Sequence, residues 1–249
     1  MQIGHYVGAV LDILFPRRCW LCARTLGRNE DRVCTVCHTG LPLARLDAMA
    51  DNAVTRLFYD VRGTCRATAY LAYRYDNAAY RLIHRLKYGN RPAIGEYIGE
   101  RMGYALLQTP FFDGIDMLIP VPLSKEKKRL RGFNQSDYLA KGLSRVTGIP
   151  MRTDIVQRVV NNPTQTNLDA QQRRANVEGI FAVNAEWAKQ YKQAGHKPLH
   201  ILLIDDVITT GATLHSLAAT LSEVGDMQLS YLGAALAGRH LNVFEQGAE

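Results

Sequence analysis

The sequence lacks an apolar run long enough to cross a membrane, and its beginning lacks the features of a signal peptide. A spanning helix needs about 18 or more apolar residues in a row, and no segment approaches that length. Residues 1–19 are moderately apolar, but they have no basic leading region and contain Asp12. We therefore expect residues 3–15 to form a short amphipathic element, no membrane insertion, and a cytoplasmic location.

Other absences narrow the class of protein. The chain has no Gly-Lys-Ser or Gly-Lys-Thr sequence, which excludes a Walker-type nucleotide loop, and it has no internal repeat or low-complexity tract. What remains is a composition of 47% hydrophobic and 21% charged residues, typical of a soluble globular protein. A length of 249 residues allows one good-sized core with a small appendage. The net charge of +7 favours anionic partners such as phosphate esters, nucleotides or nucleic acid.

Four of the five cysteines lie close together near the N-terminus. Cys19, Cys22, Cys34 and Cys37 form two C-x2-C pairs separated by eleven residues. In a reducing compartment such pairs usually bind metal, and four thiolates complete one tetrahedral Zn2+ site with no open position. The spacer between the pairs is shorter than in most zinc ribbons. We expect a structural Zn2+ in a small ribbon module.

The same segment contains a competing pattern. Residues 34–38 read CTVCH, which matches the attachment site of c-type haem. Haem would need export, an apolar pocket and a second axial ligand, and it would leave Cys19 and Cys22 without a function. We therefore favour zinc and expect His38 to be a solvated neighbour. Cys65 stands alone, and we expect a free, buried thiol there.

Apolar patterns beyond the cysteines predict strands that alternate with helices. Helices are expected at 76–90, from about 134 to 148, and at 213–225, the first of them capped by Asp76 and ended by Gly89. The basic segment 124–135 is expected to be a loop. We expect strands at 115–123, 153–160, 180–183, 200–205 and 228–237. This alternation predicts an α/β fold with a parallel sheet that helices cover on both faces, preceded by a boundary near residues 45–60.

The segment 202–214, LLIDDVITTGATL, carries the strongest functional signal. Asp205 and Asp206 come at the end of an apolar strand, where ligands bind in parallel sheets. Carboxylates only accept hydrogen bonds, so sugar hydroxyls are natural partners. The hydroxyl groups that follow stand at the start of a helix, whose free N–H groups favour a phosphate. This order of carboxylates, hydroxyls and helix start therefore indicates a site for a phosphorylated sugar. The alternative is that the segment is only a core strand followed by an N-capped helix, with Asp205 and Asp206 solvated.

These residues closely resemble the phosphoribosyl pyrophosphate (PRPP) signature of type I phosphoribosyltransferases. The four-cysteine N-terminus, LIHRLKYGN, PVPL with RGFNQ, and the segment from Arg158 to Asn176 occur in the order seen in the ComF family. The resemblance covers nearly the whole chain. It implies a helix and zinc-ribbon module at 1–58 and a phosphoribosyltransferase-like domain at 59–249, with hood elements at about 60–115 and the PRPP-binding core at about 115–240.

The resemblance also implies roles for single positions. Asp205 and Asp206 would hold the ribose hydroxyls, and residues 158–178 would form a catalytic loop. The residues implied in binding PRPP are Asp205, Asp206, Val207, Thr209, Thr210, Gly211, Ala212, Thr213, Pro122 and Arg131. Arg131, Arg158 and Arg174 would neutralise the leaving pyrophosphate, Mg2+ would be carried on the oxygens of PRPP, and the acceptor is not indicated.

ComF proteins are associated with natural competence, which involves incoming single-stranded DNA. The resemblance thus leaves two functions open, phosphoribosyl transfer and DNA binding without catalysis, and a helicase or other DNA-processing protein as a partner. Stacking rings beside cations suit single strands, and 70–91 interleaves tyrosines with basic residues. A cationic surface with tyrosines at the rim of the core is the alternative. Candidate DNA-contacting residues are Lys125, Lys127, Lys128, Arg129, Arg81, Arg85 and Lys87.

Overall fold

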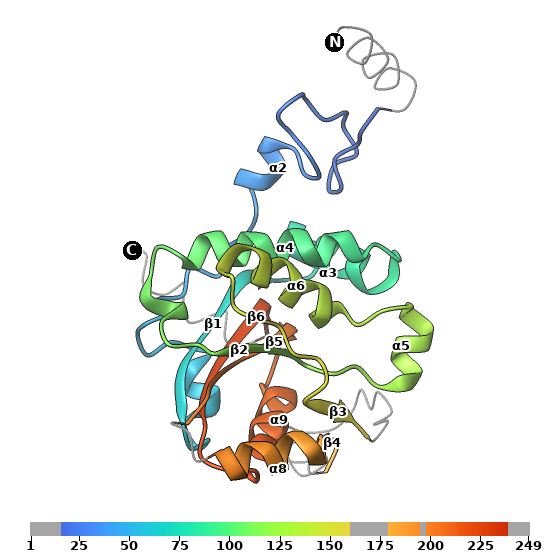
Figure 1. Cartoon of the computed structure of the whole chain (residues 1–249). Coiled ribbons are helices and arrows are strands. Elements are labelled where there is room, and N and C mark those ends of the chain that lie inside the picture. Colours follow the sequence, from blue (N-terminus) through green and yellow to red (C-terminus); the bar gives the residue numbers. More distant parts are fainter. Residues whose placement is uncertain (1–15, 160–178, 195–197, 239–249) are drawn as a thin grey trace, which may run out of the picture.

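Four parallel strands form the central sheet in this computed structural model, which describes residues 16–159, 179–194 and 198–238. The strands are β1 (Thr64–Tyr73), β2 (Met117–Pro120), β5 (His200–Ile208) and β6 (Gln228–Ala237). Their order is β1-β6-β5-β2 (Figure 1). β5 and β6 are nearly continuous apolar runs because both of their faces are covered. The predicted parallel sheet is confirmed.

Helices pack on both faces of this sheet (Figure 1). α3 (Ala78–Tyr88), α4 (Pro92–Leu106) and α6 (Gln135–Thr147) share one core with Leu202 and Ile204 of β5. The 3-10 turn η1 (Thr55–Phe58) and α9 (Ala212–Ser222) share the other core with Ile201 and Leu203. Alternate residues of one strand thus supply the two cores, as expected for an extended chain. The 3-10 turn η2 (Pro110–Phe112) precedes β2.

Glycines let α4 and α6 approach closely. A Cβ at Gly99 would lie 2.0 Å from the carbonyl oxygen of Leu139, and one at Gly142 would lie 2.1 Å from that of Glu96. No side chain fits at such distances, so each helix contacts the backbone of the other. This packing fixes α6, which follows β2 in the chain after the basic segment 124–134.

Three helices match their sequence expectation closely. α3 buries Ala79, Leu82, Ile83 and Leu86 and ends at Gly89. α6 runs from Asn134 at its N-cap to Gly148, and α9 buries three leucines on one side. The cap of α3 was wrongly expected at Asp76. Asn77 is the N-cap, and its Oδ1 accepts a hydrogen bond from the backbone N–H of Tyr80 at 2.9 Å.

The basic segment is a helix and not the expected loop. α5 (Lys125–Arg131) has Ser124 as its N-cap, and Ser124 Oγ accepts a hydrogen bond from the backbone N–H of Lys127 at 3.3 Å. Gly132 ends the helix in the left-handed region, with φ of 78°. A cap residue and a terminating glycine were both visible in the sequence, but the run of cations obscured them.

Two short strands lie outside the central sheet. β3 (Val156–Arg158) and β4 (Phe181–Val183) pair antiparallel in a sheet of their own, although the alternation predicted parallel strands. α8 (Ala185–Ala194), which was not predicted, follows β4 and packs near α9. β1, at residues where no strand was predicted, pairs with β6 in the central sheet. The hood at about 60–115 stays a prediction. A strand's partner depends on residues far away in the chain, which periodicity does not indicate.

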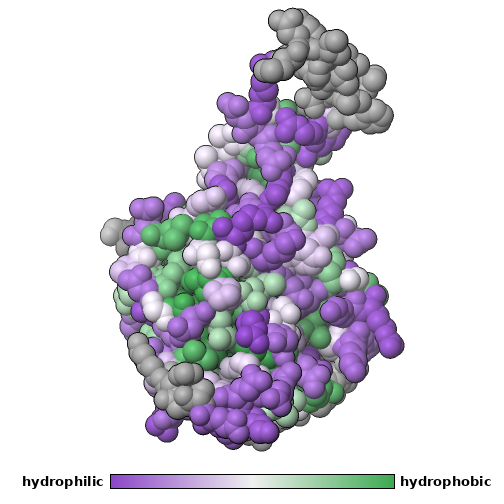
Figure 2. Space-filling model, viewed as in Figure 1, coloured by the Kyte–Doolittle hydropathy of each residue, from purple (hydrophilic) through white to green (hydrophobic). Residues whose placement is uncertain are grey.

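The cysteine-containing segment extends from the body above α4 and includes the short helix α2 (Thr35–Thr39) (Figure 1). Polar residues dominate the visible face of this segment, while apolar surface is scattered over the body (Figure 2). The N-terminal element expected at 3–15 lies outside the described residues. Among the described helices, none combines the length and the apolar character that crossing a membrane requires.

Candidate functional site

Two adjacent carboxylates lie near the carboxyl end of β5. Asp206 Oδ1 forms an ion pair with Lys87 Nζ of α3 at 3.0 Å, and only 15% and 20% of these side chains is exposed. Asp205 Oδ1 accepts a hydrogen bond from the backbone N–H of Asp206 at 2.8 Å. Burial and the neighbouring Asp206 raise the pKa of Asp205 to about 7, against the opposing effect of Lys87 and Arg158. A carboxyl whose pKa is shifted in this way by burial and a neighbouring charge is typical of functional sites.

The chain turns from β5 into α9 at Gly211. This residue has φ of 75°, and a Cβ there would lie 3.2 Å from Cζ of Phe58, so both the turn and the packing favour glycine. α9 starts at Ala212, and the first N–H groups of a helix have no partner within it. Thr209 is exposed, and Thr210 and Thr213 are partly exposed. Amide groups, hydroxyls and the helix dipole together can bind an anion here.

Four cations from three elements lie near Asp205 and Asp206, which are called the acid pair from here on. Lys127 and Arg131 lie one turn apart on α5, Lys87 comes from α3, and Arg158 ends β3. α5 and β3 lie on the same side of the molecule (Figure 1). Burial, and then the nearby charge of Arg158, Arg131 and Lys87, lower the pKa of Lys127. Burial also lowers the pKa of Arg158, against the opposing effect of Asp205.

The RGFNQ segment orients one of these cations. Arg131 Nη1 donates a hydrogen bond to Gln135 Oε1 at 2.8 Å, and its guanidinium lies 5.5 Å from the ring centroid of Tyr88. Arg131 Nε is buried and has no hydrogen-bond partner among the described residues. Asn134 Nδ2 donates to the carbonyl oxygen of Val121 at 3.0 Å, which ties the start of α6 to the end of β2. Arg131 is therefore held near the site with a donor still available.

Part of the predicted site lies outside the described residues. This applies to Arg174 and to positions 160–178 of the expected catalytic loop. Within the described residues, the remaining predicted positions lie at the carboxyl end of β5, at the start of α9, after β2, at the end of α5 and at the end of β3.

The predicted DNA-contacting cations divide into two groups. The first group is exposed or partly exposed and comprises Lys125, Lys128 and Arg129 on α5 and Arg81 and Arg85 on α3. The second group comprises Lys87 and Lys127, which lie near the acid pair. Sequence reasoning missed this division because it treated 124–135 as a loop. The spacing of four residues between Lys127 and Arg131 would have placed both on one face of a helix.

An exposed row of rings runs along α3, here called the α3 ladder. It consists of Tyr75, Tyr80, His84 and Tyr88, with successive ring centroids 5.3, 5.7 and 4.8 Å apart. Tyr75 is 86% exposed and Tyr88 is 62% exposed. The ladder ends at Arg131, beside the cations of the acid pair.

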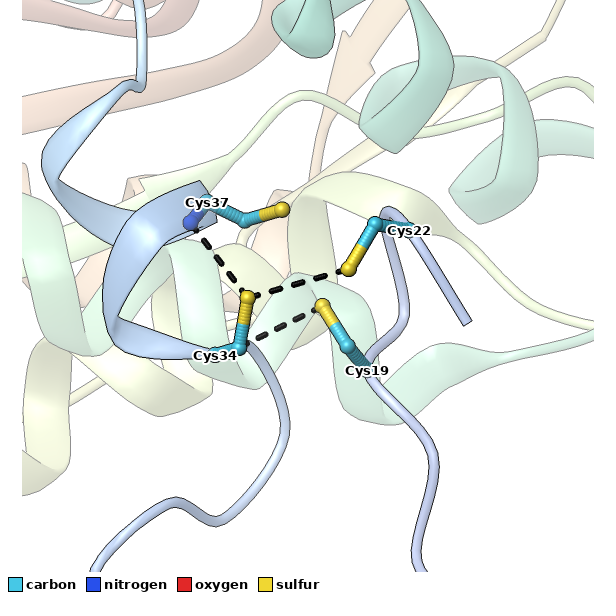
Figure 3. Close-up of side chains that lie close together, drawn as sticks. All are labelled: Cys19, Cys22, Cys34 and Cys37. Atoms are coloured by element: carbon cyan, nitrogen blue, oxygen red, sulfur yellow. Dashed lines mark hydrogen bonds between the residues drawn. The ribbon is translucent and has the colours of Figure 1, made fainter. Parts of the chain in front are cut away.

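The four N-terminal cysteines form one cluster (Figure 3). Their Sγ atoms all lie within 4.8 Å of one another, and those of Cys22 and Cys34 are 3.7 Å apart. Thiolates at about 2.3 Å from a tetrahedral Zn2+ would be about 3.8 Å apart. Backbone N–H groups of Leu21 and Cys34 donate to Cys19 Sγ at 3.4 and 3.3 Å. Such bonds stabilise thiolates, so geometry and chemistry both fit a metal site.

The cysteine cluster docks on α4 through His38 and Trp20. His38 Nδ1 and Tyr97 Oη form a hydrogen bond of 2.9 Å, and Trp20 packs edge-on against Tyr97 with centroids 6.2 Å apart. Arg32 forms an ion pair with Glu100 at 3.2 Å. His38 was wrongly expected to be solvated, since it contacts the body. Cys65 is exposed and not buried, because it lies where the register of β1 shifts against β6.

No family model matches the chain, but known proteins are similar to it in sequence. Over 159 residues the chain is 32% identical to competence protein F of Haemophilus influenzae, covering 63% of this chain and 67% of that protein. Over 225 residues it is 26% identical to the DNA utilization protein YhgH of Salmonella typhimurium, covering 84% and 92%. A solved glutamine PRPP amidotransferase from B. subtilis superposes with a TM-score of 0.38 at 17% identity, covering 61% of this chain and 30% of that one.

Proposed function

The chain belongs to the ComF family of competence proteins, and we propose that it is a phosphoribosyltransferase-like protein that binds PRPP and acts in the use of incoming DNA. One observation carries the proposal. An acid pair, the start of a helix and four cations meet at the carboxyl end of the central sheet. This combination suits a sugar that bears phosphate groups at both ends.

The proposed PRPP-binding site, also called the PRPP seat, has residues for each chemical group of PRPP. Asp205 and Asp206 accept hydrogen bonds from the ribose hydroxyls. The backbone and hydroxyls from Val207 to Thr213 bind the 5′-phosphate at the start of α9. The turn after Pro122, together with Arg131, faces the pyrophosphate. Charge-assisted hydrogen bonds of this kind contribute about 1.5–3 kcal/mol each, so a few of them hold a phosphate firmly.

We further propose that the site supports transfer of the phosphoribosyl group to an acceptor. The bond between C1 and the pyrophosphate oxygen breaks, the acceptor forms a new bond to C1, and pyrophosphate leaves with the electron pair. Arg131 and Arg158, joined by Arg174, stabilise the negative charge on the departing group. Mg2+ bound to the oxygens of PRPP would supply further charge neutralisation. The acceptor is an unidentified base or amine.

A thermal-shift titration with PRPP, with and without Mg2+, tests the proposal. A ligand at about 100 times its dissociation constant adds about 2.7 kcal/mol to the apparent stability. We expect protection that depends on Mg2+ and that Asp206→Asn abolishes, with Asp226→Asn, an exposed carboxylate, as the control. No protection of the natural protein at millimolar PRPP would contradict the proposal. Release of pyrophosphate on adding bases or amines then separates an enzyme from a protein that only senses PRPP.

A second candidate function is binding of single-stranded DNA without catalysis, with the PRPP seat as a sensor. The α3 ladder supports it, because exposed rings beside cations stack bases, at about 1–3 kcal/mol per base. Lys125, Lys128 and Arg129 lie exposed on α5 to contact the strand backbone. Affinity should fall steeply with salt. Tyr75→Ala with Tyr88→Ala should weaken DNA binding strongly and Tyr104→Ala, an exposed tyrosine of α4, should not. Equal losses would exclude the ladder as the contact surface.

We also propose a structural Zn2+ in the cysteine cluster and a cytoplasmic location, where thiols stay reduced. A closed four-thiolate site leaves no position for a substrate. Its proposed use is to hold the module against α4, where it presents a surface to a competence helicase or another DNA-processing protein. Measuring the zinc content of the purified protein, and comparing capture of such a helicase by the full chain and by a Cys34→Ser variant, tests both statements.

A further inference from the structure

The ion pair between Lys87 and Asp206 occupies the carboxylate that is proposed to hold a ribose hydroxyl. Both side chains are largely buried, and Lys87 Nζ lies 3.0 Å from Asp206 Oδ1. Lys87 stands in the last turn of α3, which packs on the same face of the sheet as α4 and α6. A substrate that binds Asp206 therefore meets Lys87 directly.

Lys127 of α5 lies near enough to Lys87 and Asp206 for their charges to act on it. It is half-buried, whereas the other five residues of 125–130 are exposed. Its position one turn before Arg131 places the two cations on one face of the helix. The charges that act on Lys127 come from Arg158, Arg131, Lys87 and Asp206. Holding a half-buried lysine beside three cations is unfavourable in the free protein and becomes favourable when a polyanion binds.

The stereochemistry of PRPP indicates which phosphate these lysines meet. In the α-anomer the pyrophosphate on C1 lies on the same face of the ring as the 2′- and 3′-hydroxyls, while the 5′-phosphate projects from the far end. A carboxylate that holds the hydroxyls therefore has the pyrophosphate beside it. The start of α9 is left for the 5′-phosphate, and α3 and α5 are left for the pyrophosphate.

We infer that Lys87 and Lys127 bind the pyrophosphate group of PRPP and that Lys87 leaves Asp206 for this group when PRPP binds. The inference rests on the proposed PRPP seat and adds two residues to it. The exchange frees Asp206 to accept a hydrogen bond from the ribose. The α3–α5 side of the site therefore selects for a sugar phosphate that is activated at C1, because ribose 5-phosphate offers the lysines no partner.

The test compares PRPP with ribose 5-phosphate as ligands of Lys87→Met, Lys127→Met and the natural protein, by calorimetry in Mg2+. Each substitution should weaken PRPP about tenfold to a hundredfold, the range of one charge-assisted contact. Neither should weaken ribose 5-phosphate by as much as about threefold, and Lys87→Met can strengthen its binding because it frees Asp206. Lys125→Met, an exposed lysine of the same helix, should bind both ligands normally. Inorganic pyrophosphate should compete with PRPP for the natural protein and less well for the variants.

The outcomes separate this inference from the proposed function. Equal weakening of both ligands in both variants, or no weakening of PRPP in either, overturns the inference and leaves the PRPP seat standing. Failure of the natural protein to bind PRPP overturns both. If Lys87→Met shows no thermal unfolding transition and so does not fold, Lys127→Met and the pyrophosphate competition test the inference in its place. Lys127 suits this purpose because it makes no ion pair among the described contacts.

Discussion

The cysteine cluster and the acid pair both crowd groups that repel one another when ionised, but the two regions give these groups different partners. In the cluster, the hydrogen bond from Arg24 lowers the pKa of Cys34 to about 6, whereas burial and the neighbouring thiols raise the pKa of Cys37. Backbone N–H groups donate to the sulfur atoms of Cys19 and Cys34. At the end of β5, burial raises the pKa of Asp205 to about 7. The first region surrounds its thiols with hydrogen-bond donors, whereas the second buries a carboxyl beside another carboxyl and so disfavours its ionised form.

Loss of one thiolate should have the largest effect and should stay within the cluster. Cys34→Ser removes a ligand that is fully buried, so we expect loss of zinc and of hydrogen-exchange protection across residues 16–40. The central sheet should keep its protection, because its strands and helices form their own cores. Cys65→Ser, at an exposed thiol, serves as the control. Retention of one zinc per chain in Cys34→Ser would contradict the assignment.

A substitution in α4 should destabilise the part of the protein that contains the central sheet and leave the cysteine cluster intact. Gly99→Ala would place a Cβ 2.0 Å from a carbonyl oxygen of α6, so we expect a loss of about 3 kcal/mol or more in unfolding free energy. At Gly103 the nearest atom is a side-chain carbon of Val146 at 2.8 Å, which can move, and Gly103→Ala should cost less. Urea denaturation measures both, and the zinc content of the folded fraction should not change.

The acid pair should lower stability as the pH rises. The carboxyl of Asp205 has a higher pKa in the folded protein than its ordinary value of 3.8, so folding binds a proton between these values and stability falls with increasing pH. Asp205→Asn is neutral throughout. It should therefore be more stable than the natural protein at pH 8, by on the order of 2 kcal/mol, and nearly equal below about pH 4. Urea denaturation at pH 4, 6 and 8 checks this, and a less stable variant at pH 8 would refute it.

The smallest expected effect concerns the contact between the cluster and α4. Tyr97→Phe removes the hydrogen bond to His38 but keeps the ring that packs against Trp20. We expect a loss of about 1 kcal/mol, seen as faster hydrogen exchange in α2 with little change in the sheet. Tyr104→Phe, at a tyrosine that is 54% exposed, should leave exchange unchanged. If α2 exchanges no faster in Tyr97→Phe, the cluster does not depend on this contact.

Local patterns predicted the helices well where one face is apolar. α3, α6 and α9 each bury side chains at helical spacing and end near a glycine or a loop, which are properties of neighbouring residues. The predictions failed where a helix has no apolar face or where a strand pairs with a segment that is distant in the chain. α5 has no buried residue, so no apolar stripe marked it, and β3 pairs with β4 across a segment of more than twenty residues.

The residues of the candidate site also divide into those that a local pattern predicts and those that only distant contacts bring together. Asp205, Asp206 and the residues up to Thr213 are consecutive, so their order alone predicted a strand end, a turn and a helix start. Lys87 and Lys127 carry no such signal, because they lie on two helices that are remote from β5 in the chain. They reach the acid pair only after α3 and α5 have packed, and sequence reasoning assigned them to DNA.

By itself, the sequence determined the elements whose cause is local: the spacing of the thiols, the apolar faces of three helices, and the run of acids, hydroxyls and glycine after β5. The tertiary structure alone decided that β1 joins the central sheet beside β6, that α5 turns Lys127 inward, and that Lys87 pairs with Asp206. The physical reason is that backbone preference and periodicity act over a few residues. Strand pairing and Coulomb interactions depend on distance in space, which is known only once the chain has folded.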